Sequence, residues 1–124
     1  MNTHQRIESA LRKFLDAFNE SRWNDFSNCI DESFKYFTDG CNIKNKEQFV
    51  LYLTNSGWDG KGYTLHDLEI LTSDDGTFAV ARYKIEFSGL VGGELSTVTA
   101  IETACCILNN NEWKMIHYHT SNKM

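Results

Sequence analysis

The chain has 124 residues, of which 41% are hydrophobic and 13% aromatic, with a net charge of -5 and a pI near 5.3. This length supports one domain over residues 1–124 with an apolar core of its own. The acidic balance, without a basic run longer than two residues, excludes the electrostatic pattern of a nucleic-acid-binding protein. No apolar stretch approaches the ~20 residues of a membrane span, and the first residues lack the apolar run of a signal peptide, so we expect a cytoplasmic protein.

The first third of the chain is predicted to be mainly helical. Apolar residues recur at helical spacing over residues 7–18, after Thr3, which can cap a first helix. Ser21 is placed to cap a short second helix. Asn45, followed by Gln48 three residues later, has the pattern of a capping box and predicts a third helix.

A short strand is predicted before the third helix, because apolar and polar residues alternate around Phe34, Tyr36 and Thr38. We expect it to end at Asp39–Gly40. After the third helix, Gly57–Gly62 contains three glycines in six residues, which predicts a mobile loop carrying Trp58.

The rest of the chain is predicted to form long strands joined by short turns: Tyr63–Leu71, Thr77–Ser88, Glu94–Leu108 and Trp113–Thr120. Short connections predict an antiparallel meander, and strands of this length must twist, so the sheet should curve strongly. Helices on one face of such a sheet give an α+β fold. The curved sheet and the helices together form a cone, and its open end is a natural site for a small molecule.

Two segments resemble a known family. Leu11–Asn19 and the ending Trp113–Ser121, with the sequence WKMIHYHTS, are similar to the NTF2-like superfamily and its SnoaL-like branch. The superfamily includes ketosteroid isomerases, polyketide cyclases, scytalone dehydratase and the association (hub) domain of calmodulin-dependent kinase II. The resemblance implies an NTF2-like cone of three N-terminal helices packed on a strongly curved, mainly antiparallel sheet. It does not fix the activity, because this fold hosts unrelated chemistries.

Several positions depart from the activities that the resemblance implies. Phe14 stands where ketosteroid isomerases carry a tyrosine, and Thr38 lies near the position of their catalytic aspartate. Neither side chain can replace the acid or the base, so isomerase chemistry by that route is not expected. The resemblance to hub domains places Arg82 in the pocket, but Thr120 occupies the position of another pocket arginine, which weakens recognition of an anion.

Glu102 is the carboxylate that we consider the candidate catalytic residue. It interrupts the apolar run Val98–Leu108, and a buried, unpaired carboxylate costs several kcal/mol, so it requires a partner or a raised pKa. Arg82 on the neighbouring predicted strand is the candidate partner. Glu102 is then a pocket acid, or the two groups form a charge pair that grips a ligand. The alternative is a structural ion pair between strands.

Phe14 and Thr120 are also expected to contact the ligand, since they stand at the pocket positions that the resemblance implies. Four further residues are predicted to line the pocket mouth with hydrogen-bonding groups on apolar bodies: Tyr36, Thr38, Tyr118 and Trp58. The two tyrosines are equally well explained as core residues. We expect Trp58, on its predicted loop, to gate the pocket.

His117 and His119 share one strand face, and this spacing can supply two zinc ligands, with His66 as a conceivable third. Zinc sites normally need at least three protein ligands, so packing at a dimer interface is the favoured explanation and no metal is predicted. The four cysteines, Cys29, Cys41, Cys105 and Cys106, contain no C-x-x-C motif and are expected to be free thiols. No cofactor fingerprint is present.

Two functions therefore remain open. The first is a homodimer, joined through the sheet face, that binds a small organic molecule in an enclosed apolar pocket. Its chemistry would be a proton transfer, as in an isomerase, cyclase or dehydratase, with Glu102 as acid or base and Arg82 orienting the ligand. The second is a non-catalytic binding or oligomerisation module like the kinase association domains. The sequence does not decide whether the chain is an enzyme.

Overall fold

The computed structural model describes residues 1–38 and 42–122, and these ranges form an α+β fold as predicted. The elements in chain order are α1 (Thr3–Asn19), α2 (Trp23–Asn28), β1 (Ile30–Thr38), β2 (Asn42–Asn45), α3 (Lys46–Thr54), β3 (Trp58–Thr72), β4 (Phe78–Val91), β5 (Glu94–Asn109) and β6 (Glu112–Asn122). The strands make one sheet in the order β2-β1-β6-β5-β4-β3. All neighbouring strands are antiparallel except β1 and β6, which run parallel. No helix in the described ranges is long and apolar enough to cross a membrane.

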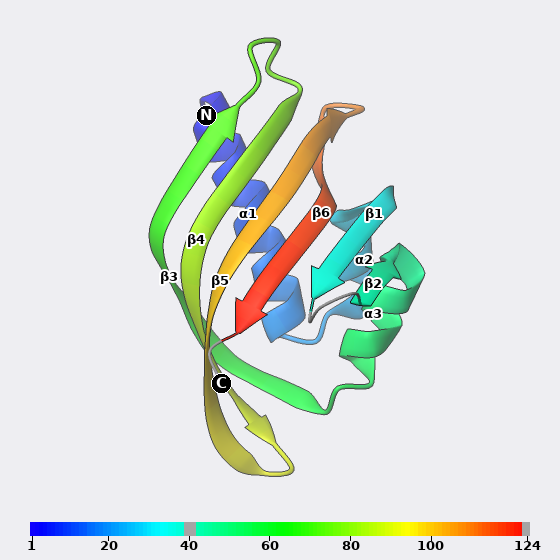
Figure 1. The fold of residues 1–124 in the computed structure, drawn as a ribbon, viewed down its shortest axis with the longest axis vertical. Helices are drawn as coiled ribbons and strands as arrows, with labels where there is room; N and C mark the ends of the chain where they lie inside the picture. The colour runs from blue at the N-terminus through cyan, green and yellow to red at the C-terminus, as the bar shows by residue number, and fades with distance from the viewer. Residues whose placement is uncertain (39–41, 123–124) are drawn as a thin grey trace.

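The sheet is strongly curved, and the helices fill its concave side. Figure 1 shows α1 lying along one face of the sheet, with α2 and α3 at the end near β1 and β2. The predicted meander of four long strands is confirmed as β3 to β6. Their length of 11 to 16 residues gives the sheet enough twist to wrap around the helices.

The helix starts agree in part with the sequence predictions. The Asn45–Gln48 capping box that opens α3 is confirmed, with the Gln48 backbone N–H donating to Asn45 Oδ1 at 2.9 Å. The predicted cap of α1 is wrong by one residue, because Asn2 rather than Thr3 makes a capping box, with Gln5. Ser21 does not cap α2. It has a positive φ of 56° in the turn between the helices, and Arg22 precedes the helix without a side-chain cap.

The strand before α3 is longer than predicted, since β1 begins at Ile30, and the short edge strand β2 was not predicted at all. The predicted end of that strand at Asp39–Gly40 lies outside the described residues, as does Cys41. Cys29, Cys105 and Cys106 are free thiols.

The predicted mobile loop Gly57–Gly62 is wrong, because most of it belongs to β3. Trp58 pairs with Val91 of β4, and the ladder continues through a bulge between Gly60 and Gly62. At Gly60 a Cβ atom would overlap the backbone of Asn19 at the end of α1. The Asn19 side chain accepts a hydrogen bond from the Gly62 N–H at 3.1 Å. Gly60 therefore allows β3 to approach α1 closely, and the Gly62 N–H adds a hydrogen bond between them.

Candidate functional site

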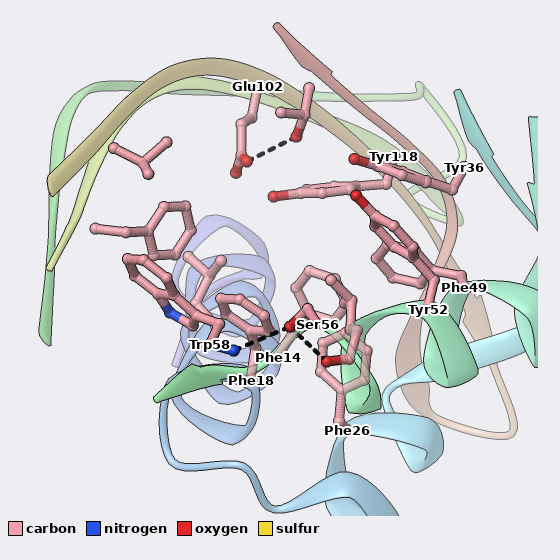
Figure 2. A pocket seen from close by; sticks show the side chains of 15 residues that line it. Phe14, Phe18, Phe26, Tyr36, Phe49, Tyr52, Ser56, Trp58, Glu102 and Tyr118 are labelled. Atoms are coloured by element: carbon pink, nitrogen blue, oxygen red, sulfur yellow. Dashed lines mark hydrogen bonds between the residues drawn. The ribbon is translucent and has the colours of Figure 1, made fainter. Parts of the chain in front are cut away.

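A cavity of about 240 Å³ lies between the concave face of the sheet and the helices (Figure 2). Most of its wall is apolar, and it draws on all three helices and on every strand except β2. Nine of the lining side chains are aromatic: Phe14, Phe18, Phe26, Tyr36, Phe49, Tyr52, Trp58, Phe87 and Tyr118. The polar lining groups are Glu102, Thr120 and Ser56 together with the tyrosine hydroxyl groups.

The aromatic side chains form a continuous packed wall. Phe14 of α1 stacks on Phe26 of α2 with ring centroids 4.8 Å apart, and it meets the edge of Tyr118 at 5.4 Å. Phe49 of α3 packs against Tyr36 of β1 at 4.5 Å. Aromatic pairs in such offset and edge-on arrangements hold one another in fixed orientations, so the cavity is pre-formed.

Glu102 is the one carboxyl group of the cavity wall in the described part of the chain. Its side chain is 3% exposed and projects from β5 toward the cavity (Figure 2). Thr120 Oγ1 of β6 donates to Glu102 Oε2 at 2.7 Å. The other oxygen, Oε1, has no hydrogen-bond partner among the described residues. One oxygen of the carboxyl group is therefore left for a ligand.

Burial raises the pKa of Glu102 above its ordinary value, and the nearby hydroxyl groups of Tyr118, Thr120 and Tyr83 offset part of this rise. Of these three hydroxyl groups in the described structure, only that of Thr120 has the distance and angle of a hydrogen bond to the carboxyl group. Tyr83 lies directly opposite Glu102 on β4, and its hydroxyl group is buried without a partner. The site thus holds a carboxyl group whose neutral form is favoured by burial.

The tyrosines nearest Glu102 act as hydrogen-bonding groups rather than as bases. Burial and the neighbouring Glu102 raise the pKa of Tyr83 and of Tyr118 well above 10. Burial also raises the pKa of Tyr36. These phenols stay protonated near neutral pH, so Glu102 is the lining group of the described ranges whose pKa is shifted toward neutrality by burial.

The prediction that Arg82 faces the cavity and pairs with Glu102 is wrong. Side chains alternate between the faces of a strand, and the β4–β5 register sets Tyr83 opposite Glu102, whereas Arg82 lies opposite Thr103. Arg82 is exposed on the outer face, where its Nη2 donates to Glu69 Oε2 at 3.2 Å. No lysine, arginine or histidine among the described residues lines the cavity.

The structure brings most of the other predicted site residues together. The cavity wall includes Phe14, Tyr36, Trp58, Tyr118 and Thr120. Thr38 is buried on β1, two residues beyond Tyr36, but it does not line the cavity.

Trp58 forms part of the wall from a paired strand rather than from a gating loop. Its indole ring packs against Gly89 of β4, where a Cβ atom would collide with the ring. Its backbone N–H donates to Ser56 Oγ at 3.3 Å, and its Nε1 is buried without a partner among the described residues. This packing fixes Trp58 in place, so the predicted role as a loop-borne gate is not supported.

His117 and His119 lie on the outer face of the sheet, away from the cavity. The His117 ring meets the edge of Phe37 at a centroid distance of 4.8 Å. His66 is on β3, three strands away from β6 in the sheet. The described residues contain no group of three side chains placed to hold a metal ion.

Several lining residues were not predicted from the sequence: Phe18, Phe26, Phe49, Phe87 and Val98. Phe87 and Val98 lie on the same strand faces as Tyr83 and Glu102, so strand alternation could have found them. The helical phenylalanines carry no such signal, because an apolar helix face looks the same whether it fills a core or borders a cavity.

Comparison with known proteins identifies the fold. The SnoaL-like domain model matches residues 7–124, and no curated protein matches the chain. An NTF2-like protein from Cytophaga hutchinsonii has a TM-score of 0.86 at 16% identity, covering 99% of this chain and 100% of its own. The association domain of C. elegans CaMKII has a TM-score of 0.78 at 17% identity, with 95% and 94% covered. A ketosteroid isomerase-like protein from Erwinia carotovora atroseptica has a TM-score of 0.79 at 15% identity, with 97% and 95% covered.

These likenesses confirm the NTF2-like fold that the resemblance implied. At such identities they extend to the fold alone, and the chemistry of the site has to be argued from its own residues.

The raised pKa of Glu102 predicts an unusual dependence of stability on pH. The folded state binds this proton more tightly than the unfolded chain, so the stabilising contribution is complete below the ordinary pKa of 4.5 and is lost as pH rises through the raised pKa. We therefore expect Glu102→Gln, which removes the buried charge, to raise the free energy of unfolding near pH 7 by on the order of 1 kcal/mol. The gain should shrink toward about pH 4, as measured by urea denaturation.

The matched control is Glu86→Gln on the outer face of β4, where the carboxyl group is exposed. It should change stability little at either pH. A Glu102→Gln protein that is less stable than the wild type near neutral pH would contradict the account of an uncompensated buried carboxyl group.

Proposed function

The chain belongs to the SnoaL-like domain family, and we propose that it binds a small, mostly apolar organic molecule in the cavity beneath the curved sheet. The observation that carries this proposal is the unpartnered Oε1 of Glu102 in a wall that is otherwise mainly aromatic. Burying a polar atom without a partner is costly, and sites that bind ligands commonly accept such a cost in exchange for recognition.

The cavity has the character of a small-molecule site. Its volume of about 240 Å³ suits a compact ligand, and its rings would cover the apolar body of that ligand. Glu102 and the hydroxyl groups near it give the site one polar end, which would orient the ligand.

Any reaction in this cavity would be a proton transfer, as in an isomerase, cyclase or dehydratase. Glu102 would be the acid or base, because its raised pKa brings it closer to neutrality and the tyrosines stay protonated. Phe14 and Thr38 cannot supply the acid and base of a ketosteroid isomerase. A catalytic role would therefore depend on Glu102, from a different strand.

A second candidate function, assembly through the outer face of the sheet, is favoured by apolar side chains exposed there. Ile101 of β5 is 61% exposed, and Phe37 of β1 is also exposed beside His117. Exposed apolar groups on one face are typical of an interface. Similarity to a CaMKII association domain supports the same idea, and we propose a homodimer joined through this face.

The ligand proposal predicts that filling the cavity removes binding. Val98 of β5 lines the cavity, so Val98→Trp should occupy it, whereas the neighbouring Thr99 is exposed and Thr99→Trp should leave it open. We expect the affinity for the neutral probe 2-phenylethanol, measured by ligand-observed NMR, to fall at least about tenfold in Val98→Trp and to change little in Thr99→Trp.

Circular dichroism would establish that both tryptophan variants fold. Binding that survives in a folded Val98→Trp protein would place the ligand elsewhere, and a wild-type protein without saturable binding would argue against the proposal.

The assembly proposal predicts that a charge on the outer face separates the subunits. Ile101→Lys should convert a dimer into a monomer in sedimentation velocity, since it would bury an unpaired ammonium group in the interface. Leu51→Lys is the control, because Leu51 of α3 is 60% exposed and does not belong to the sheet. A monomeric wild-type protein, or a dimer that persists in Ile101→Lys, would contradict this interface.

A further inference from the structure

The charge of the cavity wall limits what it can hold. Nine aromatic side chains and one carboxyl group line it, and no cationic side chain of the described residues does so. The faces of aromatic rings carry negative electrostatic potential, and a carboxylate adds to it. An anionic ligand would find no positive charge among the described residues of this wall, and the ring faces and the carboxylate would repel it. The donors left to it would be the hydroxyl groups and Trp58 Nε1.

The wall also contains a hydrogen-bond acceptor that lacks a donor among the described residues, at Glu102. Oε2 accepts a hydrogen bond from Thr120, while Oε1 is buried without a partner, in a side chain that lines the cavity. Figure 2 shows the Glu102 carboxyl group, the Tyr118 side chain and the Trp58 ring bordering the same space. A group that donates a hydrogen bond and carries positive charge would satisfy Oε1 and stabilise the ionised carboxyl group at once.

The rings close to Glu102 would contribute to the same preference. Tyr36 and Tyr118 are stacked with centroids 5.7 Å apart, and Phe14 meets Tyr118 edge-on. Cations are attracted to the faces of tyrosine, phenylalanine and tryptophan, and this attraction increases when the cation is removed from water. A ring that presents its face to the ligand would therefore add to the preference that the carboxyl group sets.

We propose that the cavity selects a small organic cation, a protonated amine on an apolar body, with Glu102 Oε1 as its hydrogen-bonded counter-ion. This inference rests on the proposed small-molecule function and names the ligand class. A neutral ligand could accept a hydrogen bond from protonated Glu102, but it would gain nothing from the combined negative potential of the rings and the carboxylate.

The test compares three probes with one phenyl group and different charges: 2-phenylethylammonium, 2-phenylethanol and 3-phenylpropanoate. Their dissociation constants are measured near pH 7 by ligand-observed NMR on the full chain. We expect the ammonium probe to bind at least about tenfold more tightly than the alcohol, as for a charge-assisted hydrogen bond, and the carboxylate to bind most weakly.

Glu102→Gln keeps the size of the side chain and removes its charge, so it should reduce the preference for the ammonium over the alcohol to about twofold or less. Glu86→Gln, on the exposed outer face, removes the same net charge and should keep the full preference. If Glu102→Gln does not fold, the comparison of the three probes on the wild-type protein still tests the proposal.

The outcomes separate the two proposals. Equal or tighter binding of the alcohol in the wild type, or an ammonium preference that survives in Glu102→Gln, would overturn the cation inference and leave a pocket for neutral molecules. If none of the three probes shows saturable binding, both the inference and the small-molecule function are contradicted.

Discussion

The burial of one carboxyl group without a cationic partner among the described residues is the constraint on which the candidate site depends. Glu102 sits in the middle of a long strand whose other fully buried residues are apolar, and the only hydrogen bond of its carboxyl group in the described structure comes from Thr120. A fold selected for stability alone would place an apolar residue there, because removing a carboxylate from water costs several kcal/mol. A ligand that occupies the cavity and donates a hydrogen bond to Glu102 would thus explain both the buried carboxyl group and the cavity beside it.

The cavity exists because the curved sheet and the helices meet at aromatic side chains and glycines. Gly60 brings β3 against the end of α1, and Gly89 makes room for the ring of Trp58. The phenylalanines of α1, α2 and α3 pack against one another and line the helix side of the cavity. The same packing therefore gives the cavity its shape and its mainly aromatic wall, in which Glu102 is the one carboxyl group of the described residues.

Much of the fold could be predicted from the sequence, since helical periodicity, strand alternation and the ending shared with SnoaL-like proteins are local signals. The position of Glu102 in an apolar run also identified it as buried. Arg82 was misplaced because strand alternation puts Arg82 and Tyr83 on opposite faces without saying which face meets the helices, and the resemblance favoured the face of Arg82. The segment Gly57–Gly62 was misjudged because glycine permits a close approach of two backbone segments as well as flexibility. Only the tertiary contact with Asn19 of α1 distinguishes the two cases.

The most direct test of the account is the titration of the Glu102 side chain, followed by carbon-13 NMR of the glutamate carboxyl groups and assigned with Glu102→Gln. An acid held in an apolar wall without a counter-charge should titrate with a midpoint above its ordinary pKa of 4.5, as its burial requires. A midpoint at or below 4.5 would mean that a cation or further donors already stabilise the carboxylate, and the case for an unfilled ligand position at Glu102 would be lost.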